Sequence, residues 1–125
     1  MVKEKVRTKE HDKSKHNTSV GLEENIEALL SYVLGWVTGL VFFLIEKKSD
    51  FVRFHAAQSL ITFLGLWIIN ILLWRIPILG VILVGLITIL EIILWILLMI
   101  KAYQHERFKL PVVGDLAENL AKKKV

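Results

Sequence analysis

The chain has 125 residues, enough for one domain. Hydrophobic residues make up 54% of it, 22% of its residues are charged, and its formal net charge is +4. The charges lie at the two ends and in residues 46–53, with none in 29–45 and only Arg75 and Glu91 in 54–100. A soluble chain of this size has too little polar surface to enclose such stretches, so they predict helices that face lipid.

Enzymatic chemistry has no support in the sequence. There is no cysteine, which excludes disulfides and thiolate metal sites. There is also no metalloprotease, nucleophile-elbow or phosphate-loop motif, so no catalytic residue, cofactor or metal site is predicted. No motif for nucleic acid is present either, and Lys-rich ends next to apolar stretches favour anionic lipid headgroups as partners.

The predicted elements, in chain order, begin with a mobile charged tail over residues 1–20, which has few large apolar residues. A transmembrane helical domain is expected over residues 21–104. Its first helix begins near Gly21, with carboxylates in the opening turns, and the first span covers about 28–45. The second span covers about 55–74 and ends before Pro77.

The third apolar stretch, residues 78–100, leaves two topologies open. As one tilted helix it gives three spans in total, which we expect because 23 residues are too few for two crossings of about 20 residues each. A break near Gly80 and Gly85 would instead give four spans. The fold class is therefore all-α, a polytopic membrane helical bundle with three transmembrane helices, or alternatively four.

Residues 105–125 are predicted to be a polar C-terminal segment with a short amphipathic helix, from Leu116 to about Lys123, at the membrane interface. With three spans the two ends of the chain lie on opposite sides of the membrane. The positive charges nearest the spans then favour a cytoplasmic C-terminus and an external N-terminus. Four spans would place both basic ends inside.

Polar residues within the predicted spans are informative, because each costs free energy in lipid unless it finds a partner. The second span carries a polar stripe on one helical face: His55, Gln58, Ser59, Thr62 and Asn70. The first span carries a face of small residues for close helix packing, with Gly35 and Gly39 in a GxxxG pattern.

Glu91 is the acid that lies deepest in an apolar stretch, roughly 15 Å from Lys101 along a helix. In an antiparallel hairpin its level matches residues of the other two spans. We therefore expect an intramembrane polar cluster of Glu91, Thr62, Ser59 and Thr38, with Glu91 protonated. Glu91 either relays protons or ions or joins helices as a neutral acid; the lack of an intramembrane base favours the second role.

Three blocks together resemble a known family: LSYVLGWVTGLVFFLIEKK (30–48), FVRFHAAQS (51–59) and KAYQHERFKLPVVGDLAE (101–118). In this order they resemble the Tic-twenty-like small membrane proteins, which include a chloroplast inner-envelope import component and prokaryotic relatives. The resemblance implies a helical membrane protein without enzymatic activity. The family-motif positions are Arg53, Phe54, His55, Gln58, Lys101, Tyr103, Pro111, Gly114 and Asp115.

The leading functional hypothesis is a non-enzymatic subunit in protein translocation or membrane-complex assembly, forming a homo-oligomer or binding a membrane-protein partner. The alternative is a small transporter or channel that uses Glu91 and the polar stripe. The basic ends and the lack of a recognisable targeting peptide favour a multi-pass protein of a prokaryotic plasma membrane.

Overall fold

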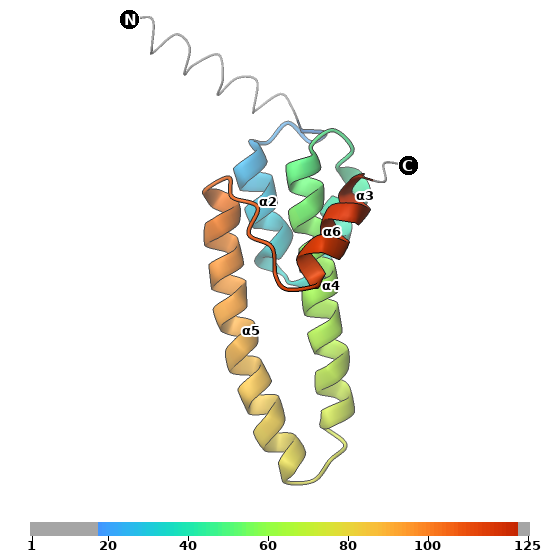
Figure 1. The fold of residues 1–125 in the computed structure, drawn as a ribbon, viewed down its shortest axis with the longest axis vertical. Coiled ribbons are helices and arrows are strands. Elements are labelled where there is room, and N and C mark those ends of the chain that lie inside the picture. The colour runs from blue at the N-terminus through green and yellow to red at the C-terminus, as the bar shows by residue number, and fades with distance from the viewer. Residues whose placement is uncertain (1–17, 123–125) are drawn as a thin grey trace, which may run out of the picture.

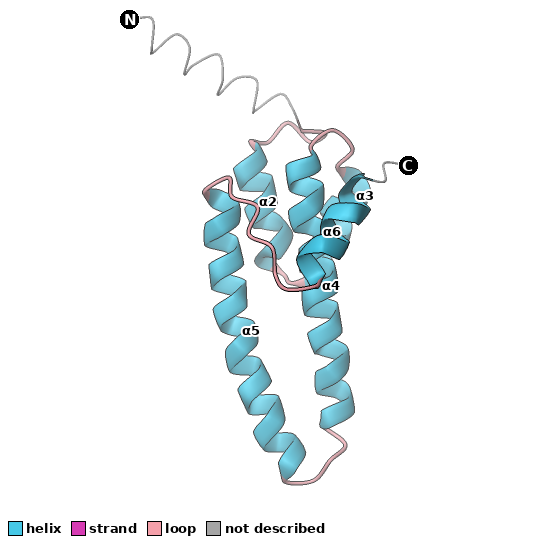
Figure 2. Cartoon of the chain, in the orientation of Figure 1, coloured by secondary structure: helices cyan, strands magenta, loops and turns pink. Residues whose placement is uncertain are grey.

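The computed structural model describes residues 18–122, so most of the predicted charged tail lies outside the described residues. The described chain forms five helices and contains no strand. Figures 1 and 2 show two long helices side by side, with three short helices gathered around one end of the pair. The helices are α2 (Glu24–Val33), α3 (Trp36–Ile45), α4 (Asp50–Leu73), α5 (Leu79–Tyr103) and α6 (Val113–Lys122).

The first apolar stretch is a hairpin of two short helices, and the prediction of one continuous first span is wrong. Helix α2 ends at Val33, and Gly35 has φ +65°, in a region that glycine enters without steric penalty. The chain reverses there, because Thr38 of α3 bonds back to the Ser31 carbonyl of α2. Each arm has 10 residues and is about 15 Å long, half of a bilayer's apolar thickness of about 30 Å.

Helices α4 and α5 form the long hairpin, and both are long and apolar enough to cross a membrane. The Ser49 side chain caps α4 by accepting a hydrogen bond from the Val52 N–H. Helix α5 continues without interruption through Gly80 and Gly85. The alternative with a break in this stretch is therefore wrong, and two candidate spans are found where three were expected.

The short hairpin packs against one half of the long hairpin (Figure 1). Helix α3 contacts α4 so closely at Gly39 that a Cβ there would lie 2.8 Å from the Leu60 nitrogen. Helix α2 contacts α5, where Trp95 donates to the Tyr32 carbonyl at 2.7 Å. The main apolar core fills this half and consists of Ala28, Tyr32, Phe51, Val52, Phe63, Leu98 and Ala102.

Helix α6 lies across α4 at the same end, where Ala117 and Ala121 pack against Phe54 and Ala57. It begins at Val113, three residues before the predicted start. Ser19 bonds to Glu46, and Arg53 bonds to the Ala121 carbonyl, so both ends of the described chain lie together. The three-span expectation of ends on opposite sides is therefore wrong for the described residues.

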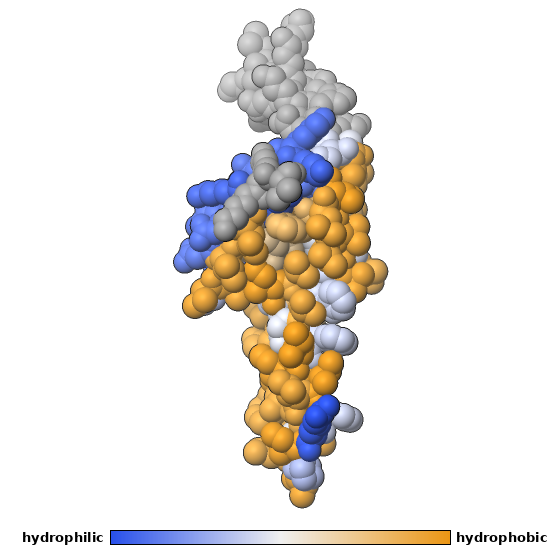
Figure 3. Space-filling model, turned by 90° about the vertical axis from the view of Figure 1, so that its right-hand side faces the viewer, coloured by the Kyte–Doolittle hydropathy of each residue, from blue (hydrophilic) through white to orange (hydrophobic). Residues whose placement is uncertain are grey.

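Polar and apolar surfaces are separated along the long axis. Figure 3 shows hydrophilic side chains concentrated at the end that carries α6, with largely apolar surface below them. Over the most apolar 18 residues of each long helix, 33% of the residues are buried in α4 but only 6% in α5. The half of the long hairpin beyond the short helices thus has apolar side chains exposed all round, the pattern of helices surrounded by lipid.

Gly39→Ala should destabilise the protein, because the added Cβ would also lie 2.9 Å from the Ala56 carbonyl oxygen. Overpacking of this kind costs about 1–3 kcal/mol. The matched control is Gly65→Ala in α4, where a Cβ meets nothing within 4 Å. Unfolding in mixed micelles should show a lower free energy of unfolding for the first variant and no loss for the second. Equal effects would contradict the observed α3–α4 contact.

Candidate functional site: the polar end of the bundle

Four segments meet at one end of the bundle, which we call the polar end: residues 18–23, the α3–α4 loop 46–49, the α5–α6 segment 104–112, and α6. Several polar side chains there are almost fully buried, among them Glu27, Glu46, Arg53, His55 and Gln58. Buried polar groups destabilise a fold unless they are bonded. Their partners therefore define what this end of the molecule does.

A buried network links α2, α4 and the α5–α6 segment. The Tyr32 hydroxyl lies 2.7 Å from His55 Nδ1, and His55 Nε2 lies 2.9 Å from the Glu106 carbonyl oxygen. A carbonyl only accepts, so Nε2 carries the hydrogen, and Nδ1 of the neutral ring accepts from the tyrosine. Gln58 Nε2 in turn donates to the tyrosine oxygen at 3.1 Å. Both ring nitrogens and the hydroxyl are thus occupied inside the protein.

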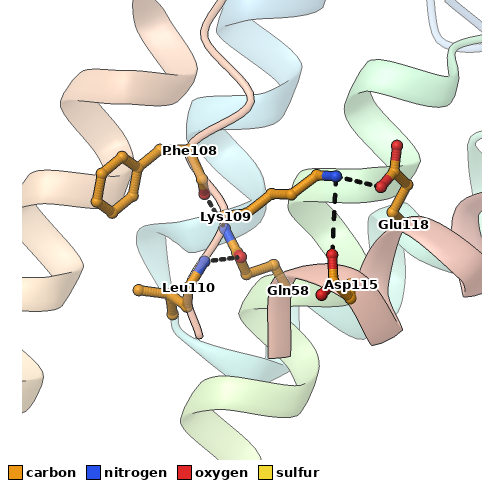
Figure 4. Close-up of polar contacts among 6 residues, drawn as sticks. All are labelled: Gln58, Phe108, Lys109, Leu110, Asp115 and Glu118. Atoms are coloured by element: carbon orange, nitrogen blue, oxygen red, sulfur yellow. Dashed lines mark hydrogen bonds and ion pairs between the residues drawn. The ribbon is translucent and has the colours of Figure 1, made fainter. Parts of the chain in front are cut away.

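Gln58 also holds the α5–α6 segment as a strand partner would (Figure 4). Its Nε2 donates to the Phe108 carbonyl at 2.8 Å, and its Oε1 accepts from the Leu110 N–H at 3.0 Å. Between these two residues, Lys109 points the other way and pairs with Glu118 and Asp115 of α6. The segment is therefore fixed to α4 on one side and to α6 on the other.

Arg53 closes the C-terminal ends of two helices. Its guanidinium donates to the Phe43 and Glu46 carbonyls at the end of α3, at 2.9 and 2.8 Å, and to the Ala121 carbonyl of α6 at 3.1 Å. It also lies 4.5 Å from the centre of the Phe43 ring. The last carbonyls of a helix lack partners within the helix and carry partial negative charge, so a buried cation stabilises both ends.

Two carboxyl groups face each other beside this arginine. Glu46 accepts from the backbone N–H groups of Ser19, Lys48 and Ser49 at 2.9–3.0 Å and from the Ser19 hydroxyl at 3.0 Å. Glu27 is fully buried, and neither of its oxygens receives an N–H or O–H donor. Burial first, and then the hydrogen bond and charge of Glu46, raise the pKa of Glu27 to about 9.

Glu46 has the opposite shift. Burial acts to raise its pKa, but the hydrogen bonds from Glu27 and from three backbone N–H groups outweigh burial and hold the pKa below its ordinary value. At neutral pH the pair therefore consists of one protonated acid, Glu27, and one carboxylate, Glu46. Neither residue was among the predicted site residues, because each lies next to a polar segment where a solvated carboxylate is the usual interpretation.

The predicted intramembrane cluster is not brought together. Glu91 accepts from Asn70 Nδ2 at 3.2 Å, not from Thr62, Ser59 or Thr38. Ser59 instead donates to the Gly35 carbonyl at 2.9 Å. Thr38 donates to Ser31, and buried Thr62 Oγ1 has no partner among the described residues. The break at Gly35 leaves backbone carbonyls exposed, and the two hydroxyls that bond to them are no longer available to Glu91.

The remaining motif positions mostly support the α5–α6 segment. Lys101 pairs with Glu106 at 3.1 Å, and the Tyr103 carbonyl accepts from Asn25 of α2 at 3.1 Å. A Cβ at Gly114 would collide with Lys109. Pro111 lines a cavity of about 480 Å³ between α4 and α5, together with Ile61, Thr62, Gly65, Leu66, Ile69, Leu90, Leu94, Leu110 and Val113.

Tyr32 is the central residue that the sequence analysis missed. It lies within an apolar run and was counted with the apolar residues, although its hydroxyl joins His55 to Gln58. The signal available in the sequence was the polar stripe on the second span, which requires a polar partner on another helix. Within residues 18–122, no group of three or more His, Cys, Asp or Glu side chains is arranged to hold a metal ion.

Gln58→Leu should release the α5–α6 segment, because the Phe108 carbonyl and the Leu110 N–H then lose their partner. Limited trypsin digestion in detergent should cleave after Arg107 and Lys109 at least several-fold faster than in the unsubstituted protein. Gln104→Leu is the matched control, since Gln104 is exposed and its side chain forms no hydrogen bond within the described part of the chain. Unchanged cleavage in Gln58→Leu would show that the segment is held by other contacts.

Comparison with known proteins gives consistent relatives. A profile described as the magnetosome magnetite crystal formation protein family matches residues 23–117. A UPF0132 membrane protein of Methanocaldococcus jannaschii is 54% identical over 101 residues, covering 81% of this chain and 91% of the relative. One from Archaeoglobus fulgidus is 50% identical over 97 residues, covering 78% and 94%. No solved structure matches the chain.

These relatives are membrane proteins of prokaryotes, as the sequence predicted. None of the names is Tic-twenty-like, so that narrower resemblance stays a prediction. The profile covers most of the chain, from the residue before α2 into α6. The chain therefore belongs to the family of small membrane proteins represented by the magnetosome magnetite crystal formation profile and the archaeal UPF0132 proteins.

Proposed function

We propose that this protein is a non-enzymatic, multi-pass subunit that assembles with other proteins inside a prokaryotic membrane. In this proposal α4 and α5 cross the bilayer, and the α2–α3 hairpin enters from the polar end and returns to the same side. The lengths support it: α4 and α5 have 24 and 25 residues, whereas each short helix reaches about halfway. In such an arrangement the irregular, partly buried backbone at Gly35 is tolerated because α4 bonds to its carbonyl.

The charges give this arrangement an orientation. The polar end carries seven of the eight basic residues from α3 to α6, and the turn between α4 and α5 carries only Arg75. Basic residues near spans remain on the cytoplasmic side. The polar end therefore faces the cytoplasm, with its anionic lipid headgroups as partners. The seven are Lys47, Lys48, Arg53, Lys101, Arg107, Lys109 and Lys122.

Single-cysteine variants test this topology cleanly, because the chain has no cysteine of its own. Val20→Cys, Lys47→Cys and Gln104→Cys should react with an impermeant maleimide only from the cytoplasmic side, in inverted vesicles. Ile76→Cys should react only from outside, in intact cells or spheroplasts. Three or four full spans would instead place Val20→Cys and Lys47→Cys on opposite sides, which would contradict the proposed hairpin.

The observation that carries the assembly role is the Asn70–Glu91 pair. It lies at the tip of the α2–α3 hairpin, where Glu91 lines a small cavity with Val33 and Gly35, and both side chains are only partly buried. The Asn70 amide oxygen is buried and has no partner within the described chain, so the group that a neighbouring helix can reach is the partly exposed Glu91 carboxyl. Polar groups at this depth are costly in lipid and favour association with another helix that can bond to them.

The polar end supports the non-enzymatic part of the proposal. His55, Gln58 and Arg53 have the side chains best suited to chemistry, and each is occupied by internal backbone or hydroxyl partners. A general base or acid must instead have a nitrogen or oxygen available to a substrate. The free-energy cost of burying these polar groups is offset by their hydrogen bonds to the α5–α6 segment and to two helix ends. Their role is therefore structural.

The comparisons suggest two kinds of complex to which such a subunit could belong. The family description names magnetite crystal formation, and the Tic-twenty-like resemblance implies protein translocation. A subunit that binds neighbouring proteins through α4 and α5 in the membrane, and has a rigid polar end in the cytoplasm, fits either kind of complex. We therefore assign the assembly role to the membrane-crossing helices α4 and α5. The partner that binds to them identifies the complex.

Energy transfer between donor- and acceptor-labelled protein in liposomes tests assembly. It should rise as lipid is reduced, and Glu91→Leu should weaken association roughly threefold, because one hydrogen bond from the partly exposed Glu91 carboxyl to a neighbouring helix is worth about 0.6 kcal/mol. Thr88→Val is the control, since the Thr88 hydroxyl is already bonded to the Val84 carbonyl. Proton flux that is lost in Glu91→Gln, without any energy transfer, would overturn this proposal in favour of a transporter.

A further inference from the structure

The polar end contains two buried carboxyl groups whose partners are very unequal. Glu46 receives three backbone N–H groups and one hydroxyl, all of them on Oε2, while Oε1 only shares the Ser19 N–H and keeps a lone pair for a further donor. Glu27 has 0% exposure and neither of its oxygens has a hydrogen-bond donor, because the hydroxyl of nearby Thr18, which acts to lower its pKa, donates to the Leu22 carbonyl instead. Two such groups facing each other away from water need a cation between them, and the smallest is a proton.

The charged surroundings of Glu27 favour a proton over a second ionised carboxylate. The charges that act on it most are the carboxylates Glu46 and Glu24. On the elements packed against α2, the basic side chains are directed elsewhere: Arg53 of α4 binds main-chain carbonyls, and Lys101 of α5 pairs with Glu106. Within the described chain, the groups with the largest effect on Glu27 include no cation.

We propose that Glu27 and Glu46 form a one-proton binding site that fastens the start of α2 to the α3–α4 loop. Glu27 carries the proton and donates it to the Glu46 carboxylate, whose other lone pairs hold Ser19, Lys48 and Ser49. Loss of the proton breaks the Glu27 O–H bond and releases H⁺ to water. Two facing carboxylates then repel each other, and residues 18–22 and 46–49 separate from α2.

The direction of the pH dependence follows from the shift at Glu27. Its pKa rises from 4.5 to about 9 in the folded protein, so the closed state binds a proton that the open state releases between these values. The closed state is therefore most favoured at low pH and is weakened as pH rises through this window. The site lies at the basic end of the bundle, so it responds to the pH on that side of the membrane.

Hydrogen exchange of the Ser19, Lys48 and Ser49 amides measures the opening directly, because all three donate to Glu46. The full chain is placed in lipid nanodiscs and studied from pH 5 to 9, with rates corrected for intrinsic exchange. In the unsubstituted protein, the opening equilibrium should rise by up to about tenfold for each pH unit. Glu27→Gln, which cannot ionise but still donates to Glu46, should make it independent of pH.

Two further variants keep the test decisive. Glu46→Gln removes the anion that holds three amides, so opening should be larger at every pH and its pH dependence should be smaller, because only the burial of Glu27 then raises the pKa of that group strongly. Glu24→Gln is the control on the same helix: among the described residues Glu24 accepts from the Ser49 hydroxyl and its charge adds the smaller part of the shift at Glu27, so the pH dependence should remain over a slightly narrower window.

Two results would overturn the proposal. The first is a pH dependence that persists in Glu27→Gln. The second is protection of the unsubstituted protein at pH 8 by millimolar Ca²⁺ that is absent in Glu27→Gln, which would make the pair a metal site.

Discussion

The fold depends on how the backbone is satisfied where the chain reverses at Gly35. In lipid, each unpaired backbone N–H or C=O costs several kcal/mol. A chain reversal within the apolar part of the bundle therefore needs hydrogen-bond partners from other helices. Ser59 of α4 donates to the Gly35 carbonyl, and Trp95 of α5 donates to the Tyr32 carbonyl. Within the hairpin itself, the Thr38 hydroxyl accepts a hydrogen bond from the Leu34 N–H. These bonds fix the short hairpin against both long helices.

The reversal also determines what meets at the polar end. Because the α2–α3 hairpin returns to where it started, the first turn of α2 and the last turn of α3 lie together, which brings Glu27 to Glu46. The same geometry places the end of α3 where Arg53 can bond to its carbonyls. A continuous first span would have carried the two acids to opposite ends, about 25–30 Å apart at 1.5 Å per residue.

Much of this fold could be predicted from composition and periodicity, since apolar stretches bounded by charges mark α4 and α5 almost to their ends. The first stretch could not, because Gly35 and Gly39 fit both a packed continuous helix and a broken one. The outcome depends on tertiary hydrogen bonds to the freed carbonyls, and a single sequence does not display them. The site was predictable in part: the polar stripe on α4 did indicate a partner helix, but not Tyr32 or the α5–α6 segment.

The two halves of the molecule differ in how their polar groups are satisfied. At the polar end, each of His55, Gln58 and Arg53 bonds to at least one backbone carbonyl from a distant segment, so the ends of four segments are fixed relative to one another. Farther along the long hairpin, Asn70 bonds to Glu91 and its amide oxygen has no partner among the described residues. Internal order at one end and unmet bonding capacity at the other is the asymmetry expected of a subunit that is rigid by itself yet incomplete within the membrane.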